Sequence, residues 1–143
     1  MITADQLVAH LVGDYVLQSD WMASEKTKRW AVALIHAMAY SLPFLLLRPS
    51  ATAWAVIVLT HAAIDRHRLA RFVVYAKNFL SPPRETVRDG NAVGFRQWWH
   101  AWRVCSGTGY HQGRPDFLAV WLLIIADNTM HIIINGAALR FLP

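Results

Sequence analysis

Apolar residues occur in four long runs along the chain, with short polar connections between them. The runs are Ala4–Gln18, Trp30–Leu47, Ala51–Asp65 and Phe117–Leu142. None sustains the alternation of apolar and polar residues that marks a half-buried strand, and Leu, Ala, Ile and Val dominate their composition. The pattern therefore predicts an all-α protein built on about four core helices.

Local signals place bends and ends in these helices. Pro43 lies inside the second run and should kink it, because its ring displaces a backbone hydrogen bond. The tripeptide "RPS" at Arg48–Ser50 predicts a tight connection to the third run. That run is expected to continue as a polar helix through Arg66–Leu80, up to the helix stop "SPPRETVRDGN" at Ser81–Asn91. Asp116 is expected to cap the fourth helix.

The composition is that of a membrane protein. The chain is 55% hydrophobic and 16% charged, whereas soluble domains have ~25% charged residues. Its seven Trp residues fit this interpretation, because indole rings favour the membrane–water interface. A span needs ~20 apolar residues, a length that Phe117–Leu142 reaches and Trp30–Leu47 nearly reaches. The start "MITADQLVAH" lacks the basic region of a signal peptide, so any span is expected to be permanent.

These features predict one membrane-embedded domain covering residues 1–143. Residues 81–115 are expected to form a cytoplasmic and interfacial loop region. Within it, "GFRQWWHAWRV" at Gly94–Val104 mixes aromatic and basic residues, which predicts a helix lying in the membrane interface. The expected fold is thus a small polytopic helical bundle with one additional interfacial helix.

The basic residues are distributed asymmetrically. Nine of the fourteen Lys and Arg residues lie between Arg66 and Asp116, and three more lie in the connection after the first run. Because basic residues flank the cytoplasmic ends of spans, both termini are expected on the far side of a bacterial cytoplasmic membrane. The basic loop could also meet anionic lipid headgroups. We do not expect nucleic-acid binding, since the sequence has no zinc knuckle, recognition helix or RNA-binding signature.

Three carboxylates lie inside the apolar runs beyond Asp5, and each has a histidine four residues away. The pairs are His10 with Asp14, His61 with Asp65, and His131 with Asp127. Residues four apart share a helix face. A carboxylate in a bilayer costs ~2.5–3.5 kcal/mol or more, so each should face the bundle interior and have a partner. About one such pair is expected by chance, and the second run adds a lone histidine, His36.

This set of side chains predicts a divalent-metal site. Imidazole and carboxylate ligands suit zinc most, and also manganese or iron. The predicted ligands are His10, Asp14, His36, His61, Asp65, Asp127 and His131. They exceed what one tetrahedral zinc uses, which favours two metals, or one metal with a catalytic acid/base pair drawn from the three carboxylates. Three polar residues on the same helix faces are expected to hydrogen-bond to these ligands and orient them, namely Gln18, Tyr40 and Asn135.

Two other interpretations of the same residues remain open. Buried His–Asp pairs can satisfy each other and hold helices together, or they can form a proton or ion relay. At the cytoplasmic mouth, Lys26, Lys28 and Arg68 could bind a phosphate group, although membrane topology explains them as well. The remaining histidines, His67, His100 and His111, are expected to be solvated.

The pattern resembles a family of small uncharacterised integral membrane proteins of bacteria and tailed phages. That family has H-L-x-G-D-[FY]-x-x-Q near the N-terminus, a lone His on the second helix, H-x-x-x-D on the third and D-x-x-x-H on the last. The matching positions here are His10, Gly13, Asp14, Gln18, Lys26, His36, His61, Asp65, Asp127 and His131. The resemblance brings no established activity. A more distant similarity, in ligand type and spacing alone, is to membrane-bound metal-dependent hydrolases.

The function expected from these observations is metal-dependent hydrolysis of a phosphoester in a lipid or a lipid-linked substrate. The metal would make a bound water nucleophilic at neutral pH, and Asp14, Asp65 and Asp127 are the candidate catalytic residues. The alternative is a non-enzymatic membrane protein whose His/Asp core is a structural metal site or a proton relay. The sequence leaves the oligomeric state open.

Overall fold

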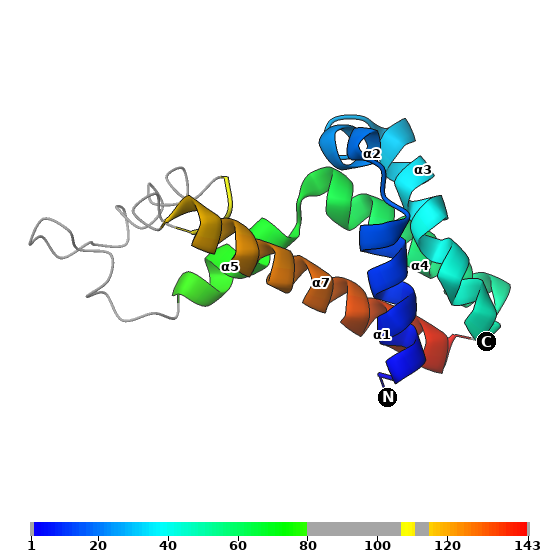
Figure 1. Ribbon diagram of the computed structural model, residues 1–143. Coiled ribbons are helices and arrows are strands. Elements are labelled where there is room, and N and C mark those ends of the chain that lie inside the picture. The colour runs from blue at the N-terminus through cyan, green and yellow to red at the C-terminus, as the bar shows by residue number, and fades with distance from the viewer. Residues whose placement is uncertain (1, 80–106, 111–114, 143) are drawn as a thin grey trace, which may run out of the picture. The chain divides into compact units, whose positions relative to one another are not determined.

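The computed structural model describes residues 2–79, 107–110 and 115–142. Within these residues the chain is all-α, as the sequence predicts (Figure 1). It forms six α-helices there. The chain divides into two compact units, Met1–Leu69 with Asn128–Pro143, and Ala70–Asp127. We call them unit 1 and unit 2. The predicted interfacial helix at residues 94–104 lies outside the described residues.

Unit 1 begins with α1 (Ala4–Leu11), which continues into a single π-helical turn, Val12–Val16. The side chain of Thr3 caps α1 by accepting a hydrogen bond from the Gln6 backbone N–H at 3.2 Å. The π-turn carries Gly13 at a close helix–helix approach. A Cβ atom at Gly13 would lie 2.4 Å from the carbonyl oxygen of Tyr40, so only glycine fits there.

The connection after this turn contains a short helix that the sequence analysis did not predict. Helix α2 (Asp20–Glu25) begins after Ser19, whose side chain accepts a hydrogen bond from the Met22 backbone N–H at 3.3 Å. Ser is a favoured N-cap residue for this reason. None of the residues of α2 is buried, and Lys26 forms its C-terminal cap. The helix is therefore capped at both ends and has no fully buried residue.

The second apolar run forms α3 (Trp30–Ser41), followed by a 3₁₀-helix, Leu42–Leu47. Pro43 lies in the first turn of the 3₁₀-helix, so the predicted disturbance at this proline takes the form of a change of helix type. Arg48 then adopts a left-handed conformation, with φ of 52°. The next helix, α4 (Ala51–His67), has Ser50 as its N-cap, which confirms the tight connection predicted here.

The third apolar run does not continue into the polar segment as one helix, so that expectation is wrong. Helix α4 ends at His67, because Arg68 is left-handed with φ of 51° and its backbone N–H bonds to the carbonyl of Asp65. The polar segment forms a separate helix, α5 (Ala70–Phe79), which belongs to unit 2. Helices commonly end at a left-handed residue, where backbone N–H groups bond back to carbonyl oxygens of the last helical turn.

The fourth run forms one long helix, α7 (Asp116–Phe141), and Asp116 is its first residue. Its first part belongs to unit 2, where Ala119 packs in a small apolar cluster with Val74 of α5 and Tyr110. From Asn128 onward it belongs to unit 1. There Ala138 joins an apolar cluster that also contains Ala9, Tyr40, Phe44 and Ile57.

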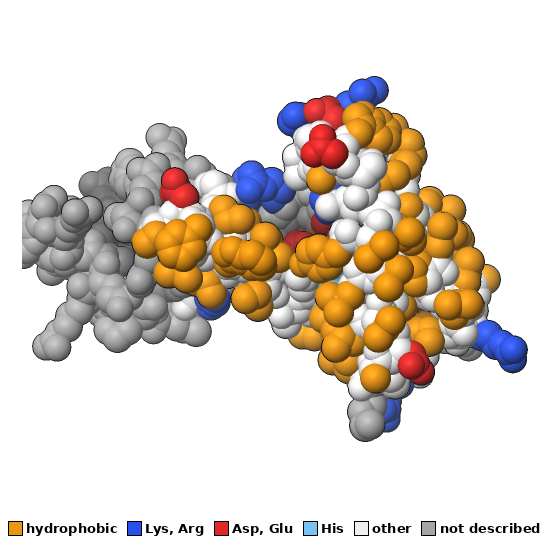
Figure 2. Space-filling model, viewed as in Figure 1, with side chains coloured by type: hydrophobic (Ala, Val, Ile, Leu, Met, Phe, Trp, Pro, Cys, Tyr) orange, Lys and Arg blue, Asp and Glu red, His pale blue; other side chains and the backbone are white. Residues whose placement is uncertain are grey.

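Unit 1 buries polar side chains next to its apolar clusters, and it also exposes many apolar side chains. Its buried polar and charged side chains are those of Gln6, His10, Asp14, His36, Ser41, His61, Asp65, His131 and Asn135. Exposed apolar side chains occur on α1, α3, α4 and α7, and Figure 2 shows them gathered along the helices, with most charged side chains of unit 1 at its two ends. Trp30–Leu47 and Asp116–Phe141 are long and apolar enough to cross a membrane.

Candidate metal centre

Five buried side chains from four segments converge inside unit 1. They form two triads in which one ligand atom of each residue lies within 4.8 Å of the others. Both triads include His61, and their members are Asp14, His36 and His61, and His61, Asp65 and His131. We call these five residues the His/Asp centre. Each is between 0% and 7% exposed, so the centre is withdrawn from the surface.

His61 and Asp65, which both lie on α4, are in contact as expected from their spacing of four residues. His61 Nε2 lies 3.2 Å from Asp65 Oδ2, within one turn of the same helix. His36 arrives from α3, and its Nε2 lies 3.3 Å from the same Asp65 oxygen and 3.0 Å from His61 Nε2. Two imidazole nitrogens therefore point at each other and at one carboxylate oxygen, an arrangement that suits a shared cation.

Asp14 reaches the centre from the π-turn. Its Oδ1 lies 3.4 Å from His36 Nε2 and 4.0 Å from His61 Nε2, so its partners lie on α3 and α4. The close approach at Gly13 explains the placement, because it brings the π-turn against α3 next to Tyr40. Single π-helical turns inside α-helices often occur at functional sites.

The oxygen Oδ2 of Asp65 is the hub of the arrangement. It is buried and has three nitrogen atoms within 3.3 Å, those of Lys26, His36 and His61. None of the three stands in good hydrogen-bonding geometry to it. The second oxygen, Oδ1, lies 3.5 Å from His131 Nε2. A buried carboxylate surrounded by nitrogens in this way needs a positive charge.

Lys26 supplies a positive charge at the centre itself. Its Nζ lies 2.8 Å from Asp65 Oδ2, 3.9 Å from Asp14 Oδ1 and 3.2 Å from His36 Nε2. The side chain is 16% exposed, so its ammonium lies at the border between the centre and the surface. From the sequence, Lys26 was expected only as an anion contact at the mouth. Its place in the family pattern was the one signal that it belongs with the His and Asp residues.

Tyr40 holds the histidines in place. Its ring stacks on that of His61 with centroids 3.7 Å apart, and His61 in turn stacks on His131 at 4.1 Å. The Tyr40 hydroxyl accepts a hydrogen bond from Asn135 Nδ2 at 2.6 Å. Tyr40 and Asn135, both predicted as supporting residues, therefore lie together beside the centre.

His10 lies in this supporting network and is not part of either triad. Its Nδ1 is 2.7 Å from the Tyr40 hydroxyl, and its Nε2 is 3.1 Å from Asn128 Oδ1. Because Asn128 Nδ2 donates to the hydroxyl of Tyr15, its Oδ1 accepts from His10 Nε2–H. Nδ1 is then the acceptor of the Tyr40 hydroxyl proton, which fixes the tautomer of His10. Asn128 and Tyr15 were missed by the sequence analysis, since neither repeats a His–Asp spacing.

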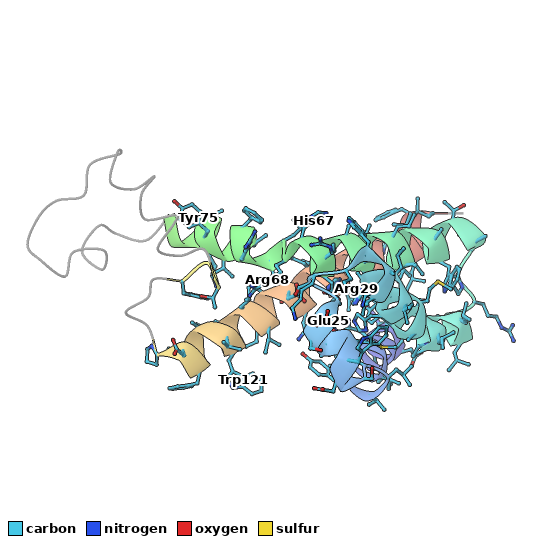
Figure 3. The ribbon with its side chains drawn as sticks, turned by 90° about the horizontal axis from the view of Figure 1, so that it is seen from above. Glu25, Arg29, His67, Arg68, Tyr75 and Trp121 are labelled. Atoms are coloured by element: carbon cyan, nitrogen blue, oxygen red, sulfur yellow. The ribbon has the colours of Figure 1, made fainter. Side chains whose placement is uncertain are left out.

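The other predicted residues lie apart from the triads. Asp127 is half-buried on α7 as the last residue of unit 2, and it belongs to neither triad. Gln18 has a buried side-chain oxygen without a hydrogen-bond partner. Lys28 pairs with Glu25 at 2.8 Å on the surface. Arg68 is exposed at the C-terminal end of α4, next to His67 (Figure 3). Their predicted roles stay predictions.

In the part of the chain that the structure describes, fold and site together define an all-α protein with a buried His/Asp centre that could hold a metal ion, and with two helices long and apolar enough to cross a membrane. The chain belongs to the DUF3307 family of proteins of unknown function, whose profile matches residues 2–87. This segment contains every residue of the centre except His131. It confirms the expectation of an uncharacterised family. No curated protein and no solved structure matches the chain.

Proposed function

We propose that this chain is a metal-dependent hydrolase embedded in the bacterial cytoplasmic membrane, acting on a phosphoester in a lipid or lipid-linked substrate. The observation that carries the proposal is the convergence of the His/Asp centre, with His36 and His61 nitrogens 3.0 Å apart beside the carboxylates of Asp14 and Asp65. Zinc is the metal that this ligand set favours, with manganese or iron as alternatives.

The distribution of side chains supports the membrane setting. A soluble bundle buries its apolar faces, but α3 exposes large apolar side chains on one side and most of α7 is not buried, while histidines and carboxylates are buried. In a lipid environment this arrangement is favourable, because the apolar surface faces the acyl chains and the polar residues pair with one another. The charged side chains at the two ends of unit 1 suit the headgroup regions (Figure 2).

The chemistry of the centre supports hydrolysis. A divalent metal would polarise a phosphoryl oxygen and lower the pKa of a bound water. Asp14 and Asp65 would hold it together with histidine nitrogens, and a spare Asp or His side chain would carry protons. Lys26, at the border of the centre, would contact the negative charge of the substrate. The predicted contacts of Lys28 and Arg68 with an anionic headgroup belong to the same proposal.

A second candidate function rests on the contacts of Lys26. Its ammonium within 3.9 Å of both carboxylates neutralises part of the buried charge without any metal. A network of Lys, Asp and His side chains satisfied in this way could hold the helices together or carry protons. This candidate is a non-enzymatic membrane protein.

Metal content and turnover separate the two candidates. We expect the full chain, purified in detergent without chelators, to contain stoichiometric transition metal by elemental analysis. It should release inorganic phosphate from polyprenyl phosphates, or a phosphorylated headgroup from glycerophospholipids, in mixed micelles. Metal without turnover would favour a structural metal site. A chain that binds none of zinc, manganese or iron even after reconstitution would contradict the hydrolase and favour the relay.

The proposed topology gives a separate expected result. Single cysteines at Thr3 and Lys28, in a Cys105→Ser background, should label from opposite sides of the membrane. A membrane-impermeant reagent applied to intact spheroplasts should label the cysteine at position 3 and spare that at position 28, because basic residues stay cytoplasmic. Labelling only at position 28 would reverse the orientation, and labelling at both would show that the first helix does not cross.

A further inference from the structure

The segment that carries Lys26 is attached to unit 1 by few interactions. Helix α2 buries none of its residues. Besides Lys26, the connection is held by the guanidinium of Arg66, which donates to the carbonyl of Thr27 at 2.9 Å. Because no residue of α2 is fully buried, the electrostatic contacts of Lys26 help to hold the segment in position. Segments with few buried apolar contacts open at low free-energy cost.

The ammonium of Lys26 contacts the same atoms that a metal would use. It lies 2.8 Å from Asp65 Oδ2 and 3.2 Å from His36 Nε2, and each of these residues belongs to one of the two triads that could hold an ion. A zinc ion would lie ~2.0–2.2 Å from such oxygen and nitrogen ligands. The lone pairs that face the ammonium would then be occupied by the metal.

The charge balance of the centre also indicates that a metal and the Lys26 ammonium would not occupy it together. Asp14 and Asp65 together carry two negative charges, and Lys26 compensates one of them. A divalent cation alone compensates both. A metal and the ammonium in contact with the same two carboxylates would leave an excess positive charge in a buried site, where like charges repel strongly.

We propose that Lys26 is an internal counter-ion of the His/Asp centre, and that a divalent cation displaces its ammonium from Asp14 and Asp65. This inference rests on the proposed metal site. The displaced Lys26 stays tethered to the C-terminal end of α2, next to the loaded centre. Its charge is then free for an anionic substrate, so metal loading both completes the centre and prepares the contact to a phosphoryl group.

The zinc affinity of a Lys26→Met variant tests whether the Lys26 ammonium and the metal compete for the same carboxylates. The full chain in detergent is titrated with Zn²⁺ against a chromophoric chelator. Lys28→Met serves as the matched control, because Lys28 is 63% exposed and, within the described residues, forms its ion pair with Glu25. We expect Lys26→Met to bind Zn²⁺ at least about fivefold more tightly than the wild type, a typical coupling between two linked sites. Lys28→Met should match the wild type.

A second measurement needs no variant and remains valid if Lys26→Met fails to fold. Acetylation of wild-type lysines by a water-soluble reagent, followed by mass spectrometry, reports how accessible each amine is. Saturating Zn²⁺ should increase the acetylation rate of Lys26 several-fold and leave that of Lys28 unchanged. This readout also distinguishes displacement from a simple electrostatic effect of removing one positive charge.

The outcomes separate the inference from the proposed function. Zinc binding to the wild type with equal or weaker binding to Lys26→Met overturns the inference and leaves the metal site intact. Protection of Lys26 by zinc also overturns it, because the amine would then be a ligand. A wild type that binds no Zn²⁺ overturns the metal site and the displacement together.

Discussion

Replacing Asp65 by Asn should remove metal from the His/Asp centre while leaving the helices folded. Asp65 Oδ2 lies within 3.3 Å of His36 and His61 nitrogens, and Oδ1 lies 3.5 Å from His131 Nε2. The amide keeps the shape of the side chain but loses the negative charge and one strong oxygen ligand. Changing a supporting residue around a metal typically lowers affinity 10–100-fold, so loss of this ligand should lower it by more than about a hundredfold.

Metal per chain by elemental analysis, with helix content by circular dichroism, measures this effect. His67→Ala is the matched control, because His67 follows Asp65 by two residues but is exposed, with its ring 5.2 Å from that of Trp30. We expect His67→Ala to keep the metal content of the wild type. Full occupancy in Asp65→Asn would show that Asp65 is a packing residue, and the structural interpretation of the buried pairs would replace the metal site.

Replacing Gly13 by Ala should destabilise the whole of unit 1. The added Cβ would lie 2.4 Å from the backbone oxygen of Tyr40 and 2.8 Å from its ring, and backbone cannot move aside as a flexible side chain can. Overpacking a tight contact costs about 1–3 kcal/mol, and the upper end is expected here. In a chain of this size that corresponds to a decrease in melting temperature of roughly 10 °C.

Thermal unfolding in detergent, followed by circular dichroism, tests the close approach at Gly13. Gly107→Ala is the control, because a Cβ at Gly107 meets nothing within 4 Å. The Gly13 variant should also bind metal more weakly, since the clash pushes Asp14 away from His36. If Gly13→Ala melts like the wild type, then the π-turn and α3 are not packed as closely as the structure has them.

The two variants act on different properties of the same centre. Asp65→Asn removes a ligand and keeps the packing, whereas Gly13→Ala keeps every ligand and disturbs the packing that brings Asp14 to His36 and His61. A double variant should therefore bind metal at least as weakly as Asp65→Asn alone, and it should unfold earlier than that variant. Such a result would show that Asp65 acts as a metal ligand and that Gly13 allows the close packing that positions Asp14.

The sequence by itself determined the four apolar helices and the kinds of polar side chain that they bury. Apolar runs separated by Pro, Ser and basic residues predicted the positions of α1, α3, α4 and α7. The spacing of four between His61 and Asp65 predicted their contact, which the structure confirms at 3.2 Å. Both results follow from local geometry, because helix periodicity fixes which residues share a face regardless of the rest of the fold.

Tertiary structure decided which of these residues meet. His10 and Asp14 have the same spacing as the α4 pair, but the π-turn that begins at Val12 interrupts the α-helical repeat between them. Asp14 contacts histidines of α3 and α4, while His10 contacts Tyr40 and Asn128. A helical repeat cannot specify such pairings, because they depend on which helix lies alongside and at what height.

For Lys26 and Arg68, which lie in connections between helices, the sequence likewise could not predict the contact of the one or the backbone conformation of the other. Only the folded chain places the Lys26 ammonium 2.8 Å from Asp65, and only the left-handed conformation of Arg68 separates α4 from α5. A lysine in a polar connection has many conformers, and its partner is selected by the negative charge that packing concentrates nearby. The sequence therefore determined which groups are available for chemistry, and long-range packing determined their arrangement around one centre.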